Sequence, residues 1–299
     1  MKITKNTTIR EIVTNPLFED YGHLLFPVDL PFSMEESITD ITNSSHYIWY
    51  SNLHVETSLE VLHFLINECQ HGKQIFYPIY SQEEVRKDRS KVDTGLFFFR
   101  GKQDSPFAVV NAGGGFQYVA ALHDSFPQAL AISQAGYNAF ALIYRPKAAY
   151  EDLGRAMDFI YIHADELGVS KGNYSLWGGS AGARMAITLG NQKGLSRYTR
   201  SGVSQASAVI GQYTGYSVAS SQDAPTFANC GTNDGIANWR VMEKRMKSLS
   251  QIGIASEFHV YKGLRHGFGI GKHTQAEGWV DQALAFWKQQ MNRTRSRRK

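Results

Sequence analysis

Residues 174–189 read YSLWGGSAGARMAITL, in which the pentapeptide Gly178-Gly179-Ser180-Ala181-Gly182 separates a short apolar run from a helix-compatible one. A sharp strand-to-helix turn holds a serine in a strained conformation with its hydroxyl exposed. The flanking positions are glycine because a side chain there would clash with the neighbouring strand and helix. The N-terminus of the following helix would also face negative charge that develops at the serine. The stretch therefore predicts that Ser180 is a nucleophile at the end of a strand.

Strand-like and helix-like runs alternate on both sides of this turn. Several of the strand-like runs are short and continuously apolar, which is typical of strands covered on both faces. The expected strands are 75–80, 95–100, 107–111, 139–144, 174–177, 202–210, 226–230 and 257–261. The expected helices are about 122–135, 153–167 with a C-cap at Gly168, the run after Ser180, 238–250 and 275–291. Two early strands followed by repeated strand–helix units predict an α/β fold, with a mostly parallel eight-stranded sheet flanked by helices.

The first 72 residues differ in texture from the rest. Residues 8–11, Thr-Ile-Arg-Glu, have capping-box spacing and predict a short helix. An apolar stripe at helical spacing predicts a second, and its members are Val55, Leu59, Leu62, Ile66 and Cys69. We therefore expect a helical N-terminal extension (1–72) packed on a catalytic domain (73–292) with a minimal cap, followed by a basic disordered tail (293–299). The sequence assigns the extension no role.

Composition and charge exclude several classes of protein. Hydrophobic residues make up 42% and charged residues 19% of the 299, which is ordinary globular usage and excludes disorder and fibrous repeats. The net charge of +4 comes from the tail, because 293–299 hold five basic residues and the remainder has a net charge of −1. We expect that tail to be solvated, with contact to a polyanion or a membrane surface as the alternative. Two cysteines, short apolar runs and no apolar stretch behind the first lysines predict a cytoplasmic protein with no nucleic-acid or membrane partner. A homo-oligomer stays open.

A run of three glycines follows the predicted strand 107–111. Residues 112–116 read Ala-Gly-Gly-Gly-Phe, so the backbone there can approach a ligand closely and point N–H groups at it. The run lies two strands before Ser180, which suits an oxyanion hole formed by the amides of Gly114, Gly115 and Ala181. The alternative is a flexible turn.

A serine nucleophile needs a base, and the base needs an orienting carboxylate. The expected chain order after the serine is acid, then histidine. Asp234 and His266 each lie in a glycine-framed loop directly after a predicted strand, so we expect them to meet Ser180 at one edge of the sheet. Asp223 is a weaker candidate acid because it precedes its strand. The other histidines considered are less suitable as the base. Three lie inside a predicted helix or strand: His63, His163 and His259. Two more, His123 and His273, flank helices and lie in no glycine-framed loop after a strand.

Other chemistries lack their motifs. No His-Glu-x-x-His and no paired Cys-x-x-Cys is present, so we expect no metal. The three glycines are not part of a Gly-x-x-x-x-Gly-Lys sequence, and no Gly-x-Gly-x-x-Gly follows a first strand. We therefore expect no nucleotide and no other cofactor.

Together with 143–145 (Ile-Tyr-Arg) and 151–156 (Glu-Asp-Leu-Gly-Arg-Ala), these motifs resemble the α/β-hydrolases over residues 75–291. The closest resemblance is to bacterial acetylesterases and carboxylesterases, including acetylxylan and feruloyl esterases. The resemblance implies Ser180 as nucleophile, His266 as general acid and base, Asp234 as its partner, and the three amides as the oxyanion hole. Two positions depart from the family pattern. Ala112 stands where relatives often have His or Pro, and Arg184 stands where they often have a smaller or neutral residue; we expect Arg184 to face solvent.

These observations predict a serine carboxylic-ester hydrolase that acts on short acyl esters, such as acetylated sugars or small aryl esters, through an acyl-enzyme. The short stretch between the last two strands before Asp234 leaves no room for a large lid, which disfavours long-chain fats. Five aromatic residues are expected to line a shallow substrate pocket: Phe116, Tyr118, Tyr213, Tyr216 and Phe268. The alternatives are a non-catalytic binding protein on the same scaffold and a serine peptidase.

Overall fold

The computed structural model describes residues 2–47 and 49–297. Within these residues an eight-stranded sheet has the order β1-β2-β4-β3-β5-β6-β7-β8. β2 runs antiparallel to both of its neighbours, and β3 to β8 are parallel, so the predicted mostly parallel sheet is confirmed. The strands are β1 (Phe76–Pro78), β2 (Gly95–Phe99), β3 (Ser105–Asn111), β4 (Asn138–Ile143), β5 (Val169–Gly179), β6 (Ala208–Gln212), β7 (Thr226–Gly231) and β8 (Ser256–Tyr261).

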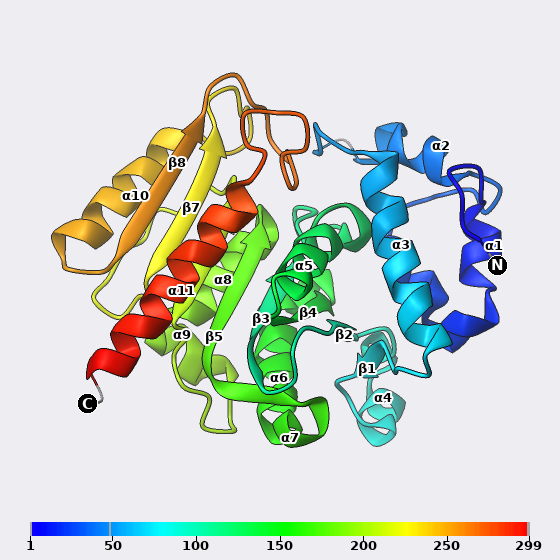
Figure 1. Cartoon of the computed structure of the whole chain (residues 1–299), viewed down its shortest axis with the longest axis horizontal. Coiled ribbons are helices and arrows are strands. Elements are labelled where there is room, and N and C mark those ends of the chain that lie inside the picture. The colour runs from blue at the N-terminus through cyan, green and yellow to red at the C-terminus, as the bar shows by residue number, and fades with distance from the viewer. Residues whose placement is uncertain (1, 48, 298–299) are drawn as a thin grey trace.

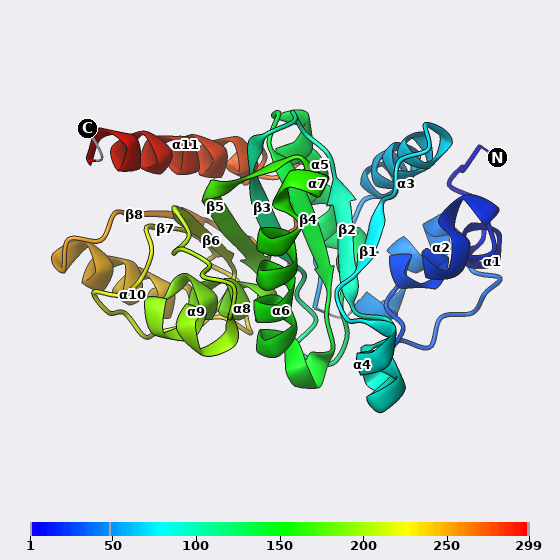
Figure 2. The ribbon, with the colours of Figure 1, turned by 90° about the horizontal axis from the view of Figure 1, so that it is seen from below.

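Helices cover both faces of the sheet (Figures 1 and 2). α5 and α11 lie on one face, and α6, α8, α9 and α10 lie on the other. Every residue of β2, β4, β6 and β7 is buried, which explains the continuous apolar runs in the sequence. The core helices are α4 (Gln82–Lys87), α5 (Ser125–Gln134), α6 (Ala149–Ile162), α7 (Ala164–Leu167), α8 (Ala181–Gly190), α9 (Gln192–Tyr198), α10 (Trp239–Gln251) and α11 (Trp279–Arg297); single 3-10 turns are η3 (Arg89–Lys91), η4 (Ala121–His123) and η5 (Pro146–Ala148).

Some boundaries differ from the sequence-based expectation. The strand expected over 202–210 begins only at Ala208, where pairing with β5 starts; the chain turns at Gly202, which has a φ of +67°. α9 was not expected, whereas the C-cap at Gly168 has the expected left-handed backbone. α11 runs to Arg297, several residues into the segment expected to be a disordered tail, and residues 298–299 of that tail lie outside the described residues. No helix in the described part of the chain is both long and apolar enough to cross a bilayer.

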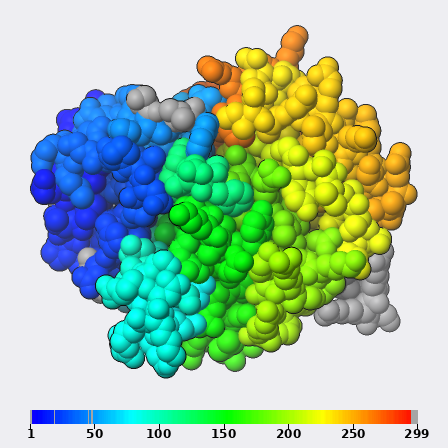
Figure 3. All heavy atoms as spheres, turned by 180° about the vertical axis from the view of Figure 1, so that it is seen from behind, coloured from blue at the N-terminus to red at the C-terminus, as the bar shows by residue number. Residues whose placement is uncertain are grey.

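The N-terminal extension packs directly on the sheet. It contains α1 (Ile9–Val13), η1 (Pro16–Leu25), α2 (Ile38–Thr42), η2 (Ser45–Tyr47) and α3 (Val55–Gln70). The capping box predicted at Thr8 and Glu11 is present, and Leu62 and Ile66 of the predicted stripe are buried. One hydrophobic cluster runs unbroken from the extension into the sheet, and Figure 3 shows the blue extension lying against the cyan and green core. The extension therefore shares its core with the rest of the chain.

Candidate active site

Ser180 is the single residue between β5 and α8. Its backbone has φ 52° and ψ −114°, a conformation that is costly for any residue with a side chain. The glycines around it are required by close packing. A Cβ on Gly178 would clash with the backbone of Gly182, and a Cβ on Gly182 would clash with the carbonyl oxygen of Asn111. The turn therefore presents the Ser180 hydroxyl at the carboxyl edge of the parallel strands, as predicted for this motif.

Ser180, His266 and Asp234 form a continuous chain of hydrogen bonds. The distance from His266 Nε2 to Ser180 Oγ is 2.9 Å, and the distance from His266 Nδ1 to Asp234 Oδ2 is 2.7 Å. The Asp234 side chain is fully buried, and its other oxygen accepts the backbone N–H groups of Ile236 and Ala237, both at 2.8 Å. These bonds fix the orientation of the carboxylate, which in turn fixes the imidazole. The structure thus brings together the three side chains that the sequence predicts to converge.

The glycine run after β3 lies beside Ser180. A Cβ on Gly113 would be 3.0 Å from the Ser180 Cβ. Gly114, Gly115 and Phe116 have φ values of 129°, 60° and 57°, so the chain turns sharply through a left-handed conformation. The amide N–H groups of Gly114, Gly115 and Ala181 donate to no acceptor among the described residues. These three backbone donors belong to the two turns that meet at Ser180, and none of them has an acceptor within the described residues.

Asp124 is a site residue that sequence reasoning missed. It is fully buried and accepts four hydrogen bonds. Its Oδ2 accepts the Gly113 N–H at 2.7 Å and the Tyr50 hydroxyl at 2.8 Å. Its Oδ1 accepts the Tyr213 hydroxyl at 2.9 Å and the Gln128 amide at 3.0 Å. Burial raises the pKa of Asp124, against the opposing effect of the Gly113, Tyr50 and Tyr213 donors. A signal was present, because a charged residue inside the largely apolar run 119–132 needs buried partners.

Two aromatic residues expected in the substrate pocket lie behind the imidazole instead. Tyr213 and Phe268 are both 0% exposed, so they offer no surface to a ligand, and that expectation is corrected for these two. The Tyr213 ring packs edge-on against His266 and against Phe268, each at 5.0 Å between ring centroids. Tyr213 therefore supports the His266 ring, and Phe268 supports Tyr213.

The other three expected pocket residues differ in how far their side chains are exposed. Phe116 is half-buried and packs on Tyr150 at 5.9 Å, and Tyr216 is half-buried beneath the Arg245 guanidinium. Tyr118 is only 2% exposed and stacks on Trp49, with 5.4 Å between ring centroids and 4° between planes. Phe116 and Tyr216 alone of the five keep substantial exposed surface. Arg184, one turn after Ser180, is exposed, as expected.

The rival candidates lie in other surroundings. Asp223 precedes β7 and pairs with the buried Arg245 guanidinium at 3.3 Å. His123 is buried with neither ring nitrogen bonded to a partner in the described structure, and burial lowers its pKa to about 3. His273 is exposed and packs edge-on against His54. Within residues 2–47 and 49–297, no group of three or more His, Cys, Asp or Glu side chains is placed to hold a metal ion.

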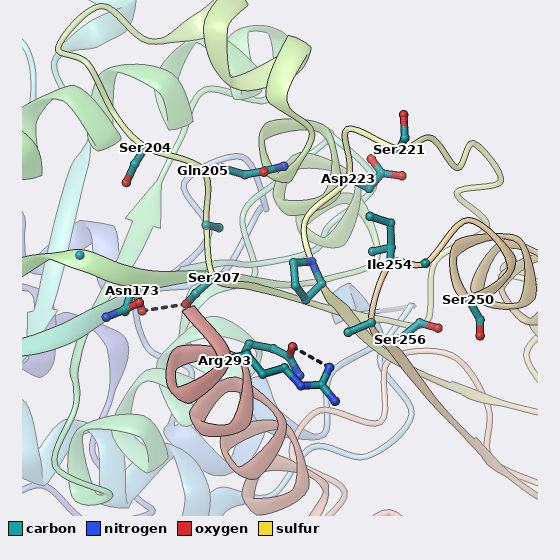
Figure 4. A pocket seen from close by; sticks show the side chains of 16 residues that line it. Asn173, Ser204, Gln205, Ser207, Ser221, Asp223, Ser250, Ile254, Ser256 and Arg293 are labelled. Carbon is teal, nitrogen blue, oxygen red and sulfur yellow. Dashed lines mark hydrogen bonds between the residues drawn. The ribbon is translucent and has the colours of Figure 1, made fainter. Parts of the chain in front are cut away.

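A large cavity lies at the opposite edge of the sheet from Ser180. Its volume is about 710 Å³, and it is drawn in Figure 4. Its walls are the segments that lead into β6, β7 and β8, including Ser207, Asp223 and Ser256, together with Arg293 of α11. Since it opens at the amino ends of the parallel strands, it has no part in the chemistry of the serine.

Comparison with known proteins places this arrangement in a familiar architecture. No family model matches the sequence, and no curated protein matches it either. Several solved structures are similar. An acetyl ester-xyloside bifunctional hydrolase from Caldicellulosiruptor lactoaceticus superimposes with a TM-score of 0.62 at 18% identity, covering 72% of this chain and 95% of that one. A propionate-bound esterase, Est2, from Thermogutta terrifontis gives 0.61 at 19% identity, covering 72% and 93%.

A third similar structure is the carboxylesterase Cest-2923 from Lactobacillus plantarum, with a TM-score of 0.58 at 20% identity over 66% of this chain and 93% of that one. At these identities the likeness concerns the fold. Together with the strand order, it shows that the chain has the α/β-hydrolase fold. More than a quarter of this chain has no counterpart in the first two neighbours, which are themselves almost completely covered.

Proposed function

We propose that the protein is a serine hydrolase that cleaves short-chain carboxylic esters through an acyl-enzyme intermediate. The observation that carries this proposal is the hydrogen-bond chain from Ser180 through His266 to Asp234, formed at a strained strand-to-helix turn. A serine hydroxyl is a poor nucleophile on its own, and this chain supplies the base and the carboxylate that orients it. The fold and the esterases that share it support the same conclusion.

Each group has a defined task in the proposed reaction. His266 Nε2 takes the proton of Ser180 as Oγ attacks the ester carbonyl, and Asp234 stabilises the resulting imidazolium. The open amides of Gly114, Gly115 and Ala181 hold the oxygen that becomes negative in the tetrahedral intermediate. His266 then donates the proton to the departing alcohol. Water repeats the sequence on the acyl-enzyme and releases the acid.

The substrate class follows from what covers the site. No helix is inserted between β6 and β7 in the described structure, so the large lid needed for interfacial action on long-chain fats is absent there. Two fold neighbours are named for acetyl esters or carry propionate. We therefore favour short acyl groups, with acetylated sugars or small aryl alcohols as the leaving group.

Covalent labelling tests the chemistry directly. A fluorophosphonate should label the wild-type chain at the peptide that contains Ser180, and Ser180→Ala should not be labelled. Turnover of an acetyl ester should fall by about 10⁴-fold or more in Ser180→Ala and in His266→Ala, with the fold intact. Ser250→Ala, an exposed serine at the end of α10, is the matched control and should keep wild-type activity. An unlabelled wild-type chain would favour a binding protein on this scaffold.

A series of p-nitrophenyl esters tests the substrate class. We expect kcat/KM to be highest for acyl chains of about two to four carbons and to fall as methylenes are added. A preference for chains longer than about eight carbons would contradict a small acyl pocket while leaving the serine chemistry in place.

A further inference from the structure

A short segment of the N-terminal extension lies between the two loops of the candidate active site. Residues 49–52, which we term the bridging segment, lie between η2 and α3. On one side, the Ser51 N–H donates to the Gly267 carbonyl at 3.0 Å, next to His266. The Asn52 side chain adds a bond to the Lys272 carbonyl at 3.1 Å. The segment is thus held to the histidine loop by both backbone and side chain.

The other side of the bridging segment contacts the glycine run. A Cβ on Gly115 would lie 2.9 Å from the Trp49 ring, and a Cβ on Gly113 would lie 2.8 Å from the Tyr50 hydroxyl oxygen. Both glycines therefore lie in close contact with side chains of the extension, and Gly115 also has a left-handed φ of 60°. The extension thus contacts both the histidine loop and the glycine run, although both lie far from it in the sequence.

Tyr50 makes the decisive contact in this segment. Its hydroxyl donates to Asp124 Oδ2 at 2.8 Å, and the same oxygen accepts the Gly113 N–H. Burial raises the pKa of the Tyr50 phenol well above its ordinary value, so the hydroxyl stays protonated and remains a donor. Asp124 also holds Tyr213, whose ring packs on His266. One carboxylate therefore ties the extension to the glycine run and to the support of the imidazole.

Removing the Tyr50 hydroxyl would leave the Asp124 oxygen with one donor in a fully buried place. A buried carboxylate that loses a donor must move, take up a proton or admit water. Each response changes its bond to the Gly113 N–H, which is adjacent to the open amide of Gly114. A small displacement matters here, because backbone donors stabilise a developing oxyanion only when they already point at it.

We propose that Tyr50 is a positioning residue that holds the glycine run in its oxyanion-binding conformation through Asp124, so that the N-terminal extension is part of the active site. The inference rests on the proposed function. It gives residues 1–72 a role that the sequence does not assign.

The test compares Tyr50→Phe with Tyr47→Phe in the full-length chain. Tyr47 lies just before the bridging segment and is 2% exposed, and its hydroxyl has no hydrogen-bond partner among the described residues. Both substitutions remove one hydroxyl and keep the ring, so Tyr47→Phe controls for any general loss of packing. Active-site titration with a fluorophosphonate normalises each variant to its folded, reactive fraction.

We expect kcat for p-nitrophenyl acetate to fall by about 10- to 100-fold in Tyr50→Phe, with KM within about twofold of wild type. Tyr47→Phe should stay within about twofold of wild type in both constants. The inhibition constant of a trifluoromethyl ketone, which forms a tetrahedral adduct with serine, should weaken in Tyr50→Phe by the same factor as kcat/KM. A loss of stability alone would not move that constant.

The outcomes separate the two hypotheses. Wild-type protein that neither reacts with the fluorophosphonate nor hydrolyses esters overturns the proposed function. Active wild-type protein with an equally active Tyr50→Phe, or with unchanged ketone inhibition, overturns the role of Tyr50 and leaves the serine chemistry standing.

Discussion

His123 makes the stability of this protein depend on pH in a calculable way. The side chain is buried against the Tyr47 ring, and neither imidazole nitrogen has a hydrogen-bond partner in the described structure. Burial lowers its pKa to about 3, whereas an unfolded chain has a histidine pKa near 6.5. Between these values the unfolded state binds a proton that the folded state does not. The part of the unfolding free energy that depends on neutral His123 is therefore fully present above about pH 6.5, and it is lost as the pH falls toward 3.

The size of this loss follows from the two pKa values. The contribution is RT times the logarithm of the ratio of the proton-binding polynomials of the unfolded and folded states. At pH 7.5 it is below about 0.1 kcal/mol, and at pH 4.5 it reaches about 2.7 kcal/mol. This is a large share of the roughly 5–15 kcal/mol that stabilises a typical domain.

The assay is chemical denaturation of wild-type protein, His123→Phe and His123→Leu at pH 7.5, 6.0 and 4.5, where the carboxylates affect all three alike. As the pH falls from 7.5 to 4.5, the unfolding free energy of each variant relative to wild type should increase by about 2.7 kcal/mol. His71→Gln, at the exposed end of α3, should follow wild type throughout. If the free energy of unfolding changed with pH by the same amount in wild type and in both His123 variants, the reasoning would be refuted.

Two further substitutions test the packing of the fold. Gly182→Ala would place a Cβ against the Asn111 carbonyl and should cost about 3 kcal/mol of stability together with most of the activity, whereas Gly215→Ala, which meets nothing within 4 Å, should do neither. Thermal melts and ester turnover of the two variants decide this, and a stable, active Gly182→Ala would count against the close approach. Arg245→Met removes the partner of the buried Asp223 and should cost about 3–5 kcal/mol, against less than about 1 kcal/mol for Lys247→Met at an exposed ion pair. If Arg245→Met and Lys247→Met unfolded at the same urea midpoint, the buried position of the Asp223–Arg245 pair would be contradicted.

The sheet and the serine turn were predictable because their determinants are local. Strands buried on both faces read as short apolar runs, and Gly178 and Gly182 are required by backbone contacts within a few residues or with the neighbouring strand. Asp234 and His266 followed from the same logic, since each lies in a loop directly after a parallel strand and such loops meet at one edge. The start of the strand expected at 202 was wrong, because the chain turns at Gly202 and pairing with β5 begins only at Ala208.

The support of the site was not predictable in this way. Tyr50 and Asp124 are 74 residues apart, and the bond between them depends on how the extension folds back over the sheet. Tyr213 and Phe268 were expected to face a ligand, because the sequence places them beside a catalytic loop. An aromatic residue there can either line the substrate pocket or pack beneath the catalytic side chain. Only the three-dimensional packing shows that they lie behind His266.

Two buried carboxylates near His266 show how surroundings, more than residue type, divide the tasks of a site. Asp234 offers one oxygen to two backbone amides and leaves the other for the imidazole at 2.7 Å. Asp124 has both oxygens occupied by donors from the glycine run, two tyrosines and a glutamine, so neither is left for His266. The nearby His266 still lowers the pKa of Asp124, against the larger effect of burial. One carboxylate is thus free to orient the base, and the other is committed to holding the loops in place. This division draws on a donor from the extension, because without Tyr50 the Oδ2 atom of Asp124 would keep only the Gly113 N–H as a donor.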